Sequence, residues 1–329
     1  MNKEDKPMLK NGHIEMPIDP SLDLRSEIAK MKKEKNAIIL AHYYTNDEVQ
    51  EIADYTGDSL GLSQKAAAND ADIIVFAGVH FMAETAKILS PNKKVLIPDS
   101  ETGCSLADSV NEKVFAEFLK QYPGYTVISY VNTTAEIKAM SDIVCTSSNA
   151  VKIVNSLPKD EKIIFGPDKN LGAYVKKVTG HENMVIWNGG CHVHGNFSVE
   201  HIKKLKQQNP EAEVLAHPEC PAEILDLASY IGATSALLKH SIESKTQKFI
   251  IATEPGILYE MKKQCPNKEF YPVLSKSNDN TINQCFDMKK NTLENIYLTL
   301  KYELPEVFVE PTLANKALSS INRMLEMSK

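Results

Sequence analysis

Apolar and polar positions alternate along the chain in blocks that predict β-strands, each followed by a helix. Three of the apolar runs, AIIL from Ala37, TVIS from Thr126 and EVLA from Glu213, are short and contain β-branched residues, as buried strands do. A polar turn and then a helical pattern follow each run. Strands that alternate with helices are typical of α/β proteins with parallel sheets.

The three runs open three segments that can be laid over one another, which indicates an internal repeat. In each segment two further strands follow in the same order, first IIVFAG, KIIFGP or KFIIAT and then KVLIPD, NMVIWN or EFYPVL. Each repeat therefore reads as β-α-β-α-β, the pattern of a small doubly wound parallel sheet with right-handed crossovers. We predict an α/β fold of three pseudo-symmetric, Rossmann-like domains around a central active site.

The repeat also sets the predicted domain boundaries. The first domain spans residues 20–108, the second residues 109–194 and the third residues 195–309. The remaining stretch, residues 310–329, has the amphipathic pattern of a helix. We expect this C-terminal helix to pack on the first domain.

Three columns of chemically useful residues recur at fixed places in the repeat. A histidine or tyrosine follows the first strand, and a second polar residue stands two positions later. A hydroxyl residue then follows the first column by the same 17 positions (59 − 42, 147 − 130 and 234 − 217). Strand–helix segments can resemble one another by chance, but this fixed spacing favours a true repeat. The columns are His42, Tyr130 and His217; Tyr44, Asn132 and Glu219; and Ser59, Ser147 and Thr234.

These columns fall where α/β sheets bind ligands, beyond the carboxyl ends of the strands. The hydroxyl column lies in polar turns at predicted helix N-caps, and Thr45 and Thr133 each precede a glutamate by three residues, as in a capping box. Because helix N-termini favour anions, we expect a small substrate that carries carboxylates or a phosphate. Four side chains there are suited to proton transfer, namely His42, Tyr44, His217 and Glu219.

Three of the six cysteines close the three repeats. Cys104, Cys191 and Cys285 lie 62, 61 and 68 residues after the first column (104 − 42, 191 − 130 and 285 − 217), the last distance being longer because of the loop SKSNDNTINQC. Three cysteines from three domains could hold a 4Fe–4S cluster, which normally takes four thiolates, so that one iron stays open as a Lewis acid. A three-cysteine zinc site with one open position is the alternative. His192 and His194, beside Cys191, fit either a metal cluster or a tight glycine loop.

Composition and charge argue against some classes of function. The chain has 329 residues and a formal net charge of −6 (37 − 43), without the basic stripe that nucleic-acid binding needs. No stretch reaches the roughly 18 apolar residues of a membrane span, and the N-terminal residues lack the apolar region of a secretory signal. We therefore expect a soluble cytoplasmic protein without disulfides, and with no nucleic-acid or membrane partner.

From about Asn36 to Glu310, the motifs resemble those of the quinolinate synthase family. They include AHYYTNDEVQEIAD, GDSLGLS, FAGVHFMAETAKIL, SYVNTTAEIKAMSD, CTSSNA, AHPEC, GATS, TEPGIL and CFDMKKNTLE, with the cysteines of PDSETGCS and WNGGCHVH. The resemblance implies three pseudo-symmetric domains and one 4Fe–4S cluster on three cysteines at their meeting point. It also implies that iminoaspartate (iminosuccinate) and dihydroxyacetone phosphate condense to quinolinate, with loss of phosphate and water, in de novo NAD synthesis.

The resemblance also implies roles for individual residues. Glu219 with His217 would shuttle protons, and Tyr44 would lie near the open iron. Because the imine is reactive, an L-aspartate-oxidising enzyme is the implied supplier of that substrate. The implied cluster ligands are Cys104, Cys191 and Cys285, and the implied catalytic residues are Tyr44, Tyr130, His217 and Glu219. The implied substrate contacts are His42, Ser59, Tyr130, Asn132, Ser147, His217, Glu219, Thr234 and Ser235.

The chain departs from the family around the last cysteine. Some members carry C-x-x-C-x-x-C there, whereas this chain has the single Cys285. Cys265 competes with it as third ligand, but it lies only 48 residues after the first column (265 − 217), so we favour Cys285. Cys145 and Cys220 are expected to be buried thiols beside the site.

Two other functions are compatible with the repeat and its cysteines. A zinc or iron–sulfur hydro-lyase acting on another small dicarboxylate would use the same anion-binding site. A non-catalytic cluster-bearing sensor would instead need a basic DNA-binding element or a partner surface, and the sequence indicates neither.

Overall fold

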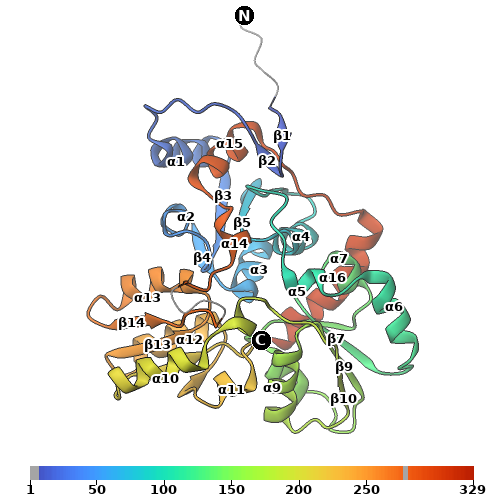
Figure 1. The fold of residues 1–329 in the computed structure, drawn as a ribbon. Helices are drawn as coiled ribbons and strands as arrows, with labels where there is room; N and C mark the ends of the chain where they lie inside the picture. Colours follow the sequence, from blue (N-terminus) through green and yellow to red (C-terminus); the bar gives the residue numbers. More distant parts are fainter. Residues whose placement is uncertain (1–6, 277–280) are drawn as a thin grey trace, which may run out of the picture. The chain divides into compact units, whose positions relative to one another are not determined.

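The computed structural model describes residues 7–276 and 281–329. Within these residues the chain forms three four-stranded parallel sheets flanked by helices, and one short antiparallel pair (Figure 1). The α/β fold of repeated Rossmann-like sheets is thereby confirmed. The long loop expected before Cys285 passes through residues 277–280, which lie outside the described residues.

The chain divides into two compact units. The first unit comprises Met1–Gly103 and Phe286–Glu310, and the second comprises Cys104–Cys285 and Pro311–Lys329. One sheet belongs to the first unit and two sheets belong to the second. The boundaries 20–108, 109–194 and 195–309 stay a prediction.

The sheet of the first unit has the strand order β4-β3-β5-β6. Alternate residues of β3 and β5, such as Ile39 and Val75, enter one apolar cluster with α1 and α15, and α3 and α4 also pack against the sheet. The strands are β1 (Leu9–Lys10), β2 (His13–Ile14), β3 (Ala37–His42), β4 (Tyr55–Gly57), β5 (Ile73–Ala77) and β6 (Lys94–Leu96). The helices are α1 (Leu24–Glu34), α2 (Asp47–Ile52), α3 (Ser59–Ala67), α4 (His80–Leu89), α14 (Phe286–Lys289) and α15 (Leu293–Tyr302).

The second unit contains two sheets, with the orders β10-β9-β7-β8 and β12-β11-β13-β14. Phe115 and Ile137 help to form the apolar cluster at the first of these sheets, and Ile202 and Val214 help to form the one at the second. The strands are β7 (Thr126–Tyr130), β8 (Ile143–Cys145), β9 (Ile163–Gly166), β10 (Met184–Ile186), β11 (Glu213–Ala216), β12 (Tyr230–Ile231), β13 (Lys248–Ala252) and β14 (Glu269–Pro272).

Short helices connect most of the strands of the second unit, and a long one follows at the C-terminal end. They are α5 (Ser105–Asp108), α6 (Glu112–Lys120), α7 (Ala135–Ala139), α8 (Ala150–Asn155), α9 (Lys169–Thr179), α10 (Val199–Gln208), α11 (Ala222–Leu225), α12 (Thr234–Glu243), α13 (Leu258–Gln264) and α16 (Pro311–Met327). Two 3₁₀ turns are η1 (His194–Asn196) and η2 (Pro255–Ile257).

The repeat seen in the sequence extends to strand order and register. In each sheet the strands stand in the order second, first, third, fourth. The first and second strands pair with the same offset of 15 residues, as in His42 with Gly57, Tyr130 with Cys145 and Ala216 with Ile231 (57 − 42, 145 − 130 and 231 − 216). The second strand of each sheet was not predicted, because it is only two or three residues long.

The C-terminal helix corrects one expectation. The sequence placed residues 310–329 on the first domain, but α16 packs on α7 and β8 of the second unit (Figure 1). Its buried stripe includes Ile321 and Met324, and Ser320 Oγ donates a hydrogen bond to the backbone oxygen of Lys138 (2.8 Å). An amphipathic pattern fixes which face of a helix is buried, but it does not identify the surface that covers it.

The helix-start chemistry also differs from its prediction. The N-caps of α2 and α7 are Asn46 and Thr134, so Thr45 and Thr133 do not form capping boxes. Each of these threonines instead turns its hydroxyl back to the last strand residue, with Oγ1 donating to His42 O (2.9 Å) and Tyr130 O (3.0 Å). These bonds fix the tight turn that follows the first strand of the repeat.

The hydroxyl column lies beside the predicted N-caps rather than at them. Ser59 and Thr234 are the first residues of α3 and α12, and Asp58 and Ala233 are the caps. Ser147 lies two residues before the cap of α8. The hydroxyls still stand at helix starts.

Candidate functional site

The first two columns of the repeat lie at the carboxyl ends of the first strands. Tyr130 is the last residue of β7, and His217 directly follows β11. Each of these strands stands between the second and third strands of its sheet. The chain therefore crosses to one side of the first strand and then to the other, so the strand order reverses at this point. Such switch points are where open α/β sheets bind ligands.

Glu219 is the centre of a buried polar group in the second unit. Its side chain is almost fully buried, and Tyr130 Oη donates to its Oε1 atom (2.5 Å). His194 Nδ1 lies 3.0 Å from Oε2, and His217 Nδ1 lies 3.7 Å from Oε1. Three side chains from separate loops therefore converge on one carboxylate.

The surroundings of Glu219 favour its ionised form. Burial by itself would raise the pKa of Glu219, but the adjacent His194 and His217 and the hydroxyl of Tyr130 outweigh it and lower the pKa to about 2. The carboxylate is thus charged throughout the neutral range. It is available as a proton acceptor or as a ligand for a cation.

His217 connects Glu219 to the hydroxyl column. Its Nδ1 atom accepts a hydrogen bond from the backbone N–H of Glu219 (3.3 Å), and its Nε2 atom lies 3.2 Å from Ser147 Oγ. Four residues singled out by the columns, Tyr130, Ser147, His217 and Glu219, are therefore brought together. Cys145, Cys220 and Cys265 are buried thiols.

The remaining column residues of the second unit lie on neighbouring loops. Asn132 follows Tyr130 by two residues, and its Oδ1 atom is buried without a hydrogen-bond partner in the described part of the chain. Thr234 is buried at the start of α12, and Ser235 follows it. A buried amide oxygen without a protein partner is suited to accept a hydrogen bond from a ligand.

The corresponding residues of the first unit repeat the local geometry. His42 Nδ1 accepts from the backbone N–H of Tyr44 (3.2 Å), just as His217 accepts from that of Glu219. The His42 and Tyr44 rings meet edge to face, with centroids 4.5 Å apart. Ser59 begins α3, so the first unit carries its own copy of the three columns.

All three repeat-closing cysteines belong to the second unit. Cys104 precedes α5, Cys191 follows β10, and Cys285 is the last residue before α14; each is a partly exposed free thiol. Burial, and then the charges of Cys285 and Glu219, raise the pKa of Cys104 to about 12. Burial, and then the charge of Glu219, also raise the pKa of Cys191, and the charge of Cys104 raises it further. Cys104 and Cys191 therefore resist ionisation unless a cation is bound.

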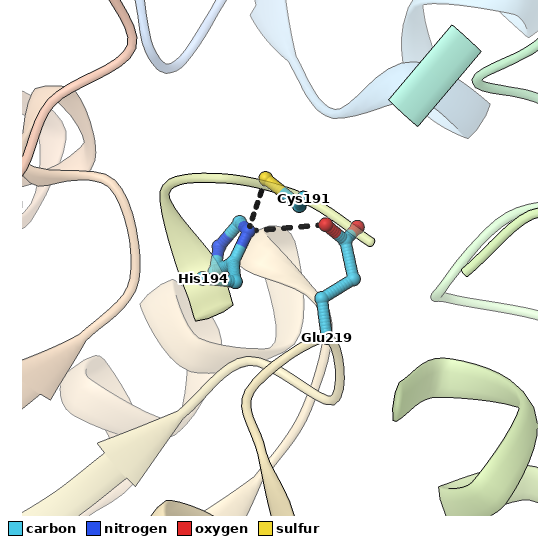
Figure 2. Close-up of side chains that lie close together, drawn as sticks. All are labelled: Cys191, His194 and Glu219. Atoms are coloured by element: carbon cyan, nitrogen blue, oxygen red, sulfur yellow. Dashed lines mark hydrogen bonds and ion pairs between the residues drawn. The ribbon is translucent and has the colours of Figure 1, made fainter. Parts of the chain in front are cut away.

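His194 joins Cys191 and Glu219 in a group that could hold a metal ion. One ligand atom from each residue lies within 4.8 Å of the others (Figure 2). His194 Nδ1 is 3.3 Å from Cys191 Sγ, and its Nε2 atom lies 3.0 Å from Thr253 Oγ1, which orients the ring. The sequence left His194 open between a metal site and a glycine loop, and the structure places it in the polar group.

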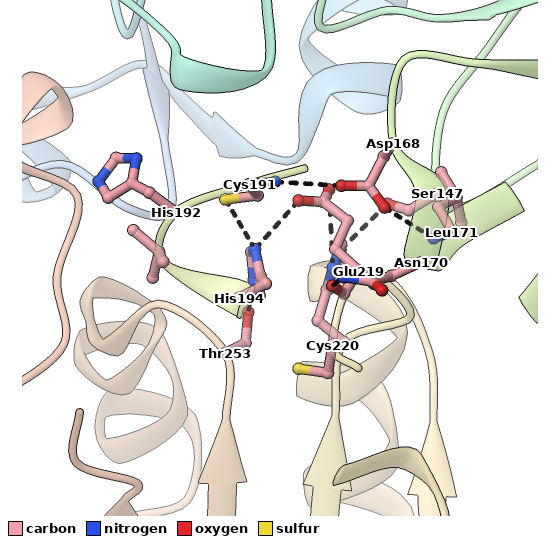
Figure 3. Close-up of polar contacts among 12 residues, drawn as sticks. Ser147, Asp168, Asn170, Leu171, Cys191, His192, His194, Glu219, Cys220 and Thr253 are labelled. Carbon is pink, nitrogen blue, oxygen red and sulfur yellow. Dashed lines mark hydrogen bonds and ion pairs between the residues drawn. The ribbon is translucent and has the colours of Figure 1, made fainter. Parts of the chain in front are cut away.

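His192 lies apart from this group. Its Nδ1 atom is 2.8 Å from Ser105 Oγ, and its ring is turned away from Glu219 (Figure 3). The two histidines beside Cys191 thus have different surroundings, although they stand only two positions apart in the sequence.

Asp168 and Glu254 are two buried carboxylates that the sequence analysis did not single out. Asp168 accepts a hydrogen bond from the backbone N–H of Cys191 (Figure 3), and Glu254 accepts one from that of Cys285. Burial, and then the charge of Glu219, raise the pKa of Asp168 to about 7. The available signal was their matching place in GPDKN and TEPG, just beyond the third strand of a repeat.

Comparison with known proteins identifies the family. The model of the quinolinate synthetase A protein family matches residues 26–326. The chain belongs to this family. Curated relatives named quinolinate synthase are 56% identical over 306 residues in Rippkaea orientalis and in a Synechocystis strain, covering 93% of this chain and 94% and 96% of theirs. One from Chloroherpeton thalassium is 53% identical over 308 residues, covering 94% and 95%.

These matches confirm the resemblance that the motifs indicated, and the chain is an enzyme of this family. The matched region takes in the columns of all three repeats and the three repeat-closing cysteines. Within the described residues, none of the helices combines the length and the apolar character that crossing a bilayer requires.

Proposed function

We propose that the chain condenses iminoaspartate (iminosuccinate) with dihydroxyacetone phosphate to quinolinate, releasing phosphate and two molecules of water, and so supplies de novo NAD synthesis. The observation that carries this proposal is the match to the family over residues 26–326. The buried group around Glu219 supports it, because the reaction needs several proton transfers away from bulk water.

The proposed cofactor is one 4Fe–4S cluster held by Cys104, Cys191 and Cys285. The donor set fits it, because all three residues are free thiols of one unit, and the charge of Glu219 opposes the ionisation of Cys104 and Cys191. A bound cationic group would remove that opposition. When bound, such a cluster supplies one iron without a cysteine ligand, a Lewis acid for a substrate oxygen or nitrogen.

Proton transfer is assigned to the Glu219 group. Glu219 is charged at neutral pH, but the groups that lower its pKa also make it a weak base, so the proton that it accepts has to come from an already acidic position of the substrate. Tyr130, within hydrogen-bond distance of Glu219, can relay that proton. His194 and His217 flank the carboxylate and stabilise its charge until the proton arrives. Loss of water from the condensed chain then needs the reverse transfer, to a departing hydroxyl.

Substrate carboxylates are assigned to the polar column residues. Ser147 and His217 Nε2 already form one polar pair, and the α12 N-terminus at Thr234 and Ser235 favours negative charge. Asn132 offers an unpaired buried amide oxygen to the imine N–H or a hydroxyl. By the family resemblance, His42 and Ser59 are further substrate contacts and Tyr44 is a catalytic residue.

The proposed setting is the cytoplasm. All six cysteines are free thiols, and a cluster with an open iron needs a reducing compartment. The proposed partners are the two small-molecule substrates, with an L-aspartate-oxidising enzyme as supplier of the imine. Nucleic acid and membranes have no part in this proposal.

A metal-dependent hydro-lyase acting on another small dicarboxylate is the second candidate. The observation that favours it is the group of Cys191, His194 and Glu219, because one sulfur, one nitrogen and one oxygen ligand suit a zinc ion with an open fourth position.

The test is a metal and sulfide analysis of anaerobically purified protein, followed by an assay with both substrates. Iron and sulfide in about equal numbers, about four each per chain, together with quinolinate and phosphate formation, would support the proposed synthase. One zinc without sulfide, and no quinolinate, would overturn it in favour of the hydro-lyase. Glu219→Gln should retain the metal content of a cluster that has only cysteine ligands but lower the rate of quinolinate formation at least 100-fold.

A further inference from the structure

Two cysteine-bearing loops of the second unit are anchored in the same way. The backbone N–H of Cys191 donates to Asp168 Oδ2 (3.2 Å), and that of Cys285 donates to Glu254 Oε1 (3.2 Å). Both acids have an exposed fraction of 0%. Water therefore does not compete for these bonds, and each loop is tied to a buried carboxylate through the cysteine itself.

The second oxygen of each carboxylate is used to start a helix. Asp168 Oδ1 accepts from the backbone N–H of Leu171 (2.7 Å) in the first turn of α9, and Glu254 Oε2 accepts from that of Gly256 (2.7 Å) in η2. One side chain thus links a helix start to a cysteine loop in both cases. Each acid stands two residues beyond the end of the third strand of its sheet.

The two acids occupy equivalent places in the repeat. Asp168 stands two residues after Gly166, and Glu254 stands two residues after Ala252. Gly166 and Ala252 pair with the first strand of their sheets at Ser129 and Ala216, each one position before a first-column residue. The same device has therefore been kept in two copies of one folding unit.

The first unit achieves a similar end with a different residue. Val79 stands at the equivalent place, two residues after Ala77, and has no acceptor side chain. Within that unit, however, Asp287 Oδ1 accepts from the backbone N–H of Gly103 (3.1 Å), the residue before Cys104. A carboxylate thus holds the backbone at or next to each of the three cysteines.

We propose that Asp168 and Glu254 are positioning residues that hold Cys191 and Cys285 ready for a metal cluster and retain the cluster afterwards. This inference rests on the proposed function, because that function supplies the cluster. By fixing both loops before metal arrives, the carboxylates remove the need to order the loops on binding. Outer-shell partners of metal ligands typically change metal affinity about 10- to 100-fold.

The carboxylates also affect the charge around the cluster. A backbone N–H that donates to a carboxylate is not free to donate to a cluster sulfur. Negative charge next to the ligands disfavours addition of an electron. With a cluster bound, the loss of these N–H donors, together with any negative charge on the two acids, would favour the oxidised form, which suits a Lewis acid rather than an electron carrier.

The test compares Asp168→Asn and Glu254→Gln with the wild-type chain. Asn is as good an N-cap as Asp, so its one oxygen can keep the bond to Leu171 while the link to Cys191 is lost. Glu260→Gln is the matched control, because Glu260 is also buried in the second unit but accepts hydrogen bonds from Lys263 and Gln264 on its own helix. Thermal unfolding of the cluster-free forms shows whether each variant folds. If one variant does not fold, the other is enough for the test.

The main readout is the rate at which reconstituted protein loses iron to a chelator under anaerobic conditions. We expect about tenfold faster loss in each variant and an unchanged rate in Glu260→Gln. A second readout separates positioning from mere structural support. At a fixed potential the reduced-to-oxidised ratio of the cluster should rise about tenfold in Glu254→Gln, equivalent to 59 mV for one electron.

The outcomes separate this inference from the proposed function. If the wild-type chain takes up no iron and sulfide, the proposed function fails and with it the basis of the inference. If the wild-type chain forms its cluster, and both variants lose iron at the wild-type rate with an unchanged redox ratio, the positioning role is wrong while the proposed function stands.

Discussion

At the scale of single residues, charge in the site depends on which groups surround Glu219. A carboxylate as buried as this one would ordinarily have a raised pKa, but two histidines and a tyrosine hydroxyl lower it. The neighbouring Asp168 shares the burial but has a raised pKa, partly because Glu219 is charged. Two carboxyl groups a short distance apart are thus suited to different protonation states, a pattern that often marks acid–base sites.

Tyr130→Phe tests the hydrogen bond to Glu219. Phenylalanine fills the same space but cannot donate, so the carboxylate loses one of the groups that stabilise its charge and position. We expect quinolinate formation to slow about 100-fold, with thermal unfolding close to that of the wild-type chain. Tyr122→Phe is the control, because the Tyr122 ring contacts the rings of Phe118 and Tyr125 rather than Glu219. This variant should keep the wild-type rate. A wild-type rate in Tyr130→Phe would remove Tyr130 from the proton relay.

A pH-dependent contribution to stability is expected away from the site, at Glu213. Burial would raise the pKa of Glu213, but hydrogen bonds from His240, Thr246 and Ser244 outweigh it and lower the pKa. Because the folded pKa lies below the unfolded one, the stabilisation is complete above the unfolded pKa and is lost as pH falls through the folded pKa. Glu213→Gln should therefore cost about 1–2 kcal/mol at pH 7.

That cost should shrink between about pH 5 and pH 3, where the wild-type carboxylate becomes protonated. Urea unfolding of both proteins across this range measures it. The same free-energy difference at pH 7 and at pH 3 would show that the ionised carboxylate is not the stabilising form.

At the scale of secondary-structure elements, the repeat explains why the sequence was informative. The first and third strands of each repeat are four to six residues long and strongly apolar, so their pattern is clear. The second strands are two or three residues long, and periodicity needs more positions than that. The missed strands explain the 17-residue spacing, because they bring the hydroxyl turn beside the end of the first strand.

Tyr130, Ser147, His217 and Glu219 could be predicted from the sequence because they stand at positions that recur in every repeat. His194, Asp168 and Glu254 were harder to find for different reasons. His194 has no counterpart in the columns, and its role depends on a ring orientation set by Thr253. The two acids follow the third strand, and only the hydrogen bonds to cysteine N–H groups separate them from ordinary helix caps.

The packing of α16 on the second unit gives a prediction at this scale. Met324 is fully buried against the second unit, whereas Arg323 beside it is exposed. Met324→Ala should lower the free energy of unfolding by about 2–5 kcal/mol through lost contacts and a cavity, and Arg323→Ala should change it by less than about 0.5 kcal/mol. Denaturant unfolding measures both values. Equal, small effects would contradict the observed place of the helix.

Ser328, the residue that follows that helix, contacts the loop that carries Ser147. Asn149 Oδ1 accepts from the backbone N–H of Thr146 (2.6 Å), and its Nδ2 atom donates to Ser328 Oγ (2.8 Å). The C-terminal end of the chain therefore steadies a loop of the proposed substrate site, a connection that sequence distance alone could not indicate.

At the scale of the whole molecule, metal binding should be coupled to stability. The three proposed ligands are spread over the second unit at Cys104, Cys191 and Cys285, so an unfolded chain would not present them together. A ligand that binds only the folded state stabilises it by mass action. Loaded protein should therefore unfold at a higher temperature than protein stripped by a chelator.

Cys285→Ala should abolish this coupling, and Cys265→Ala is its matched control. Cys265 is buried, with its thiol 3.7 Å from the backbone oxygen of Ser241, so its loss should cost about 1 kcal/mol of stability but leave iron content unchanged. Cys285→Ala should instead show no iron–sulfur absorption and the same unfolding temperature with and without reconstitution. The measurement is calorimetry on anaerobic samples of both variants before and after iron and sulfide are added. If Cys265→Ala loses the cluster and Cys285→Ala keeps it, the third ligand is Cys265, and the anchoring of Cys285 by Glu254 would need another explanation.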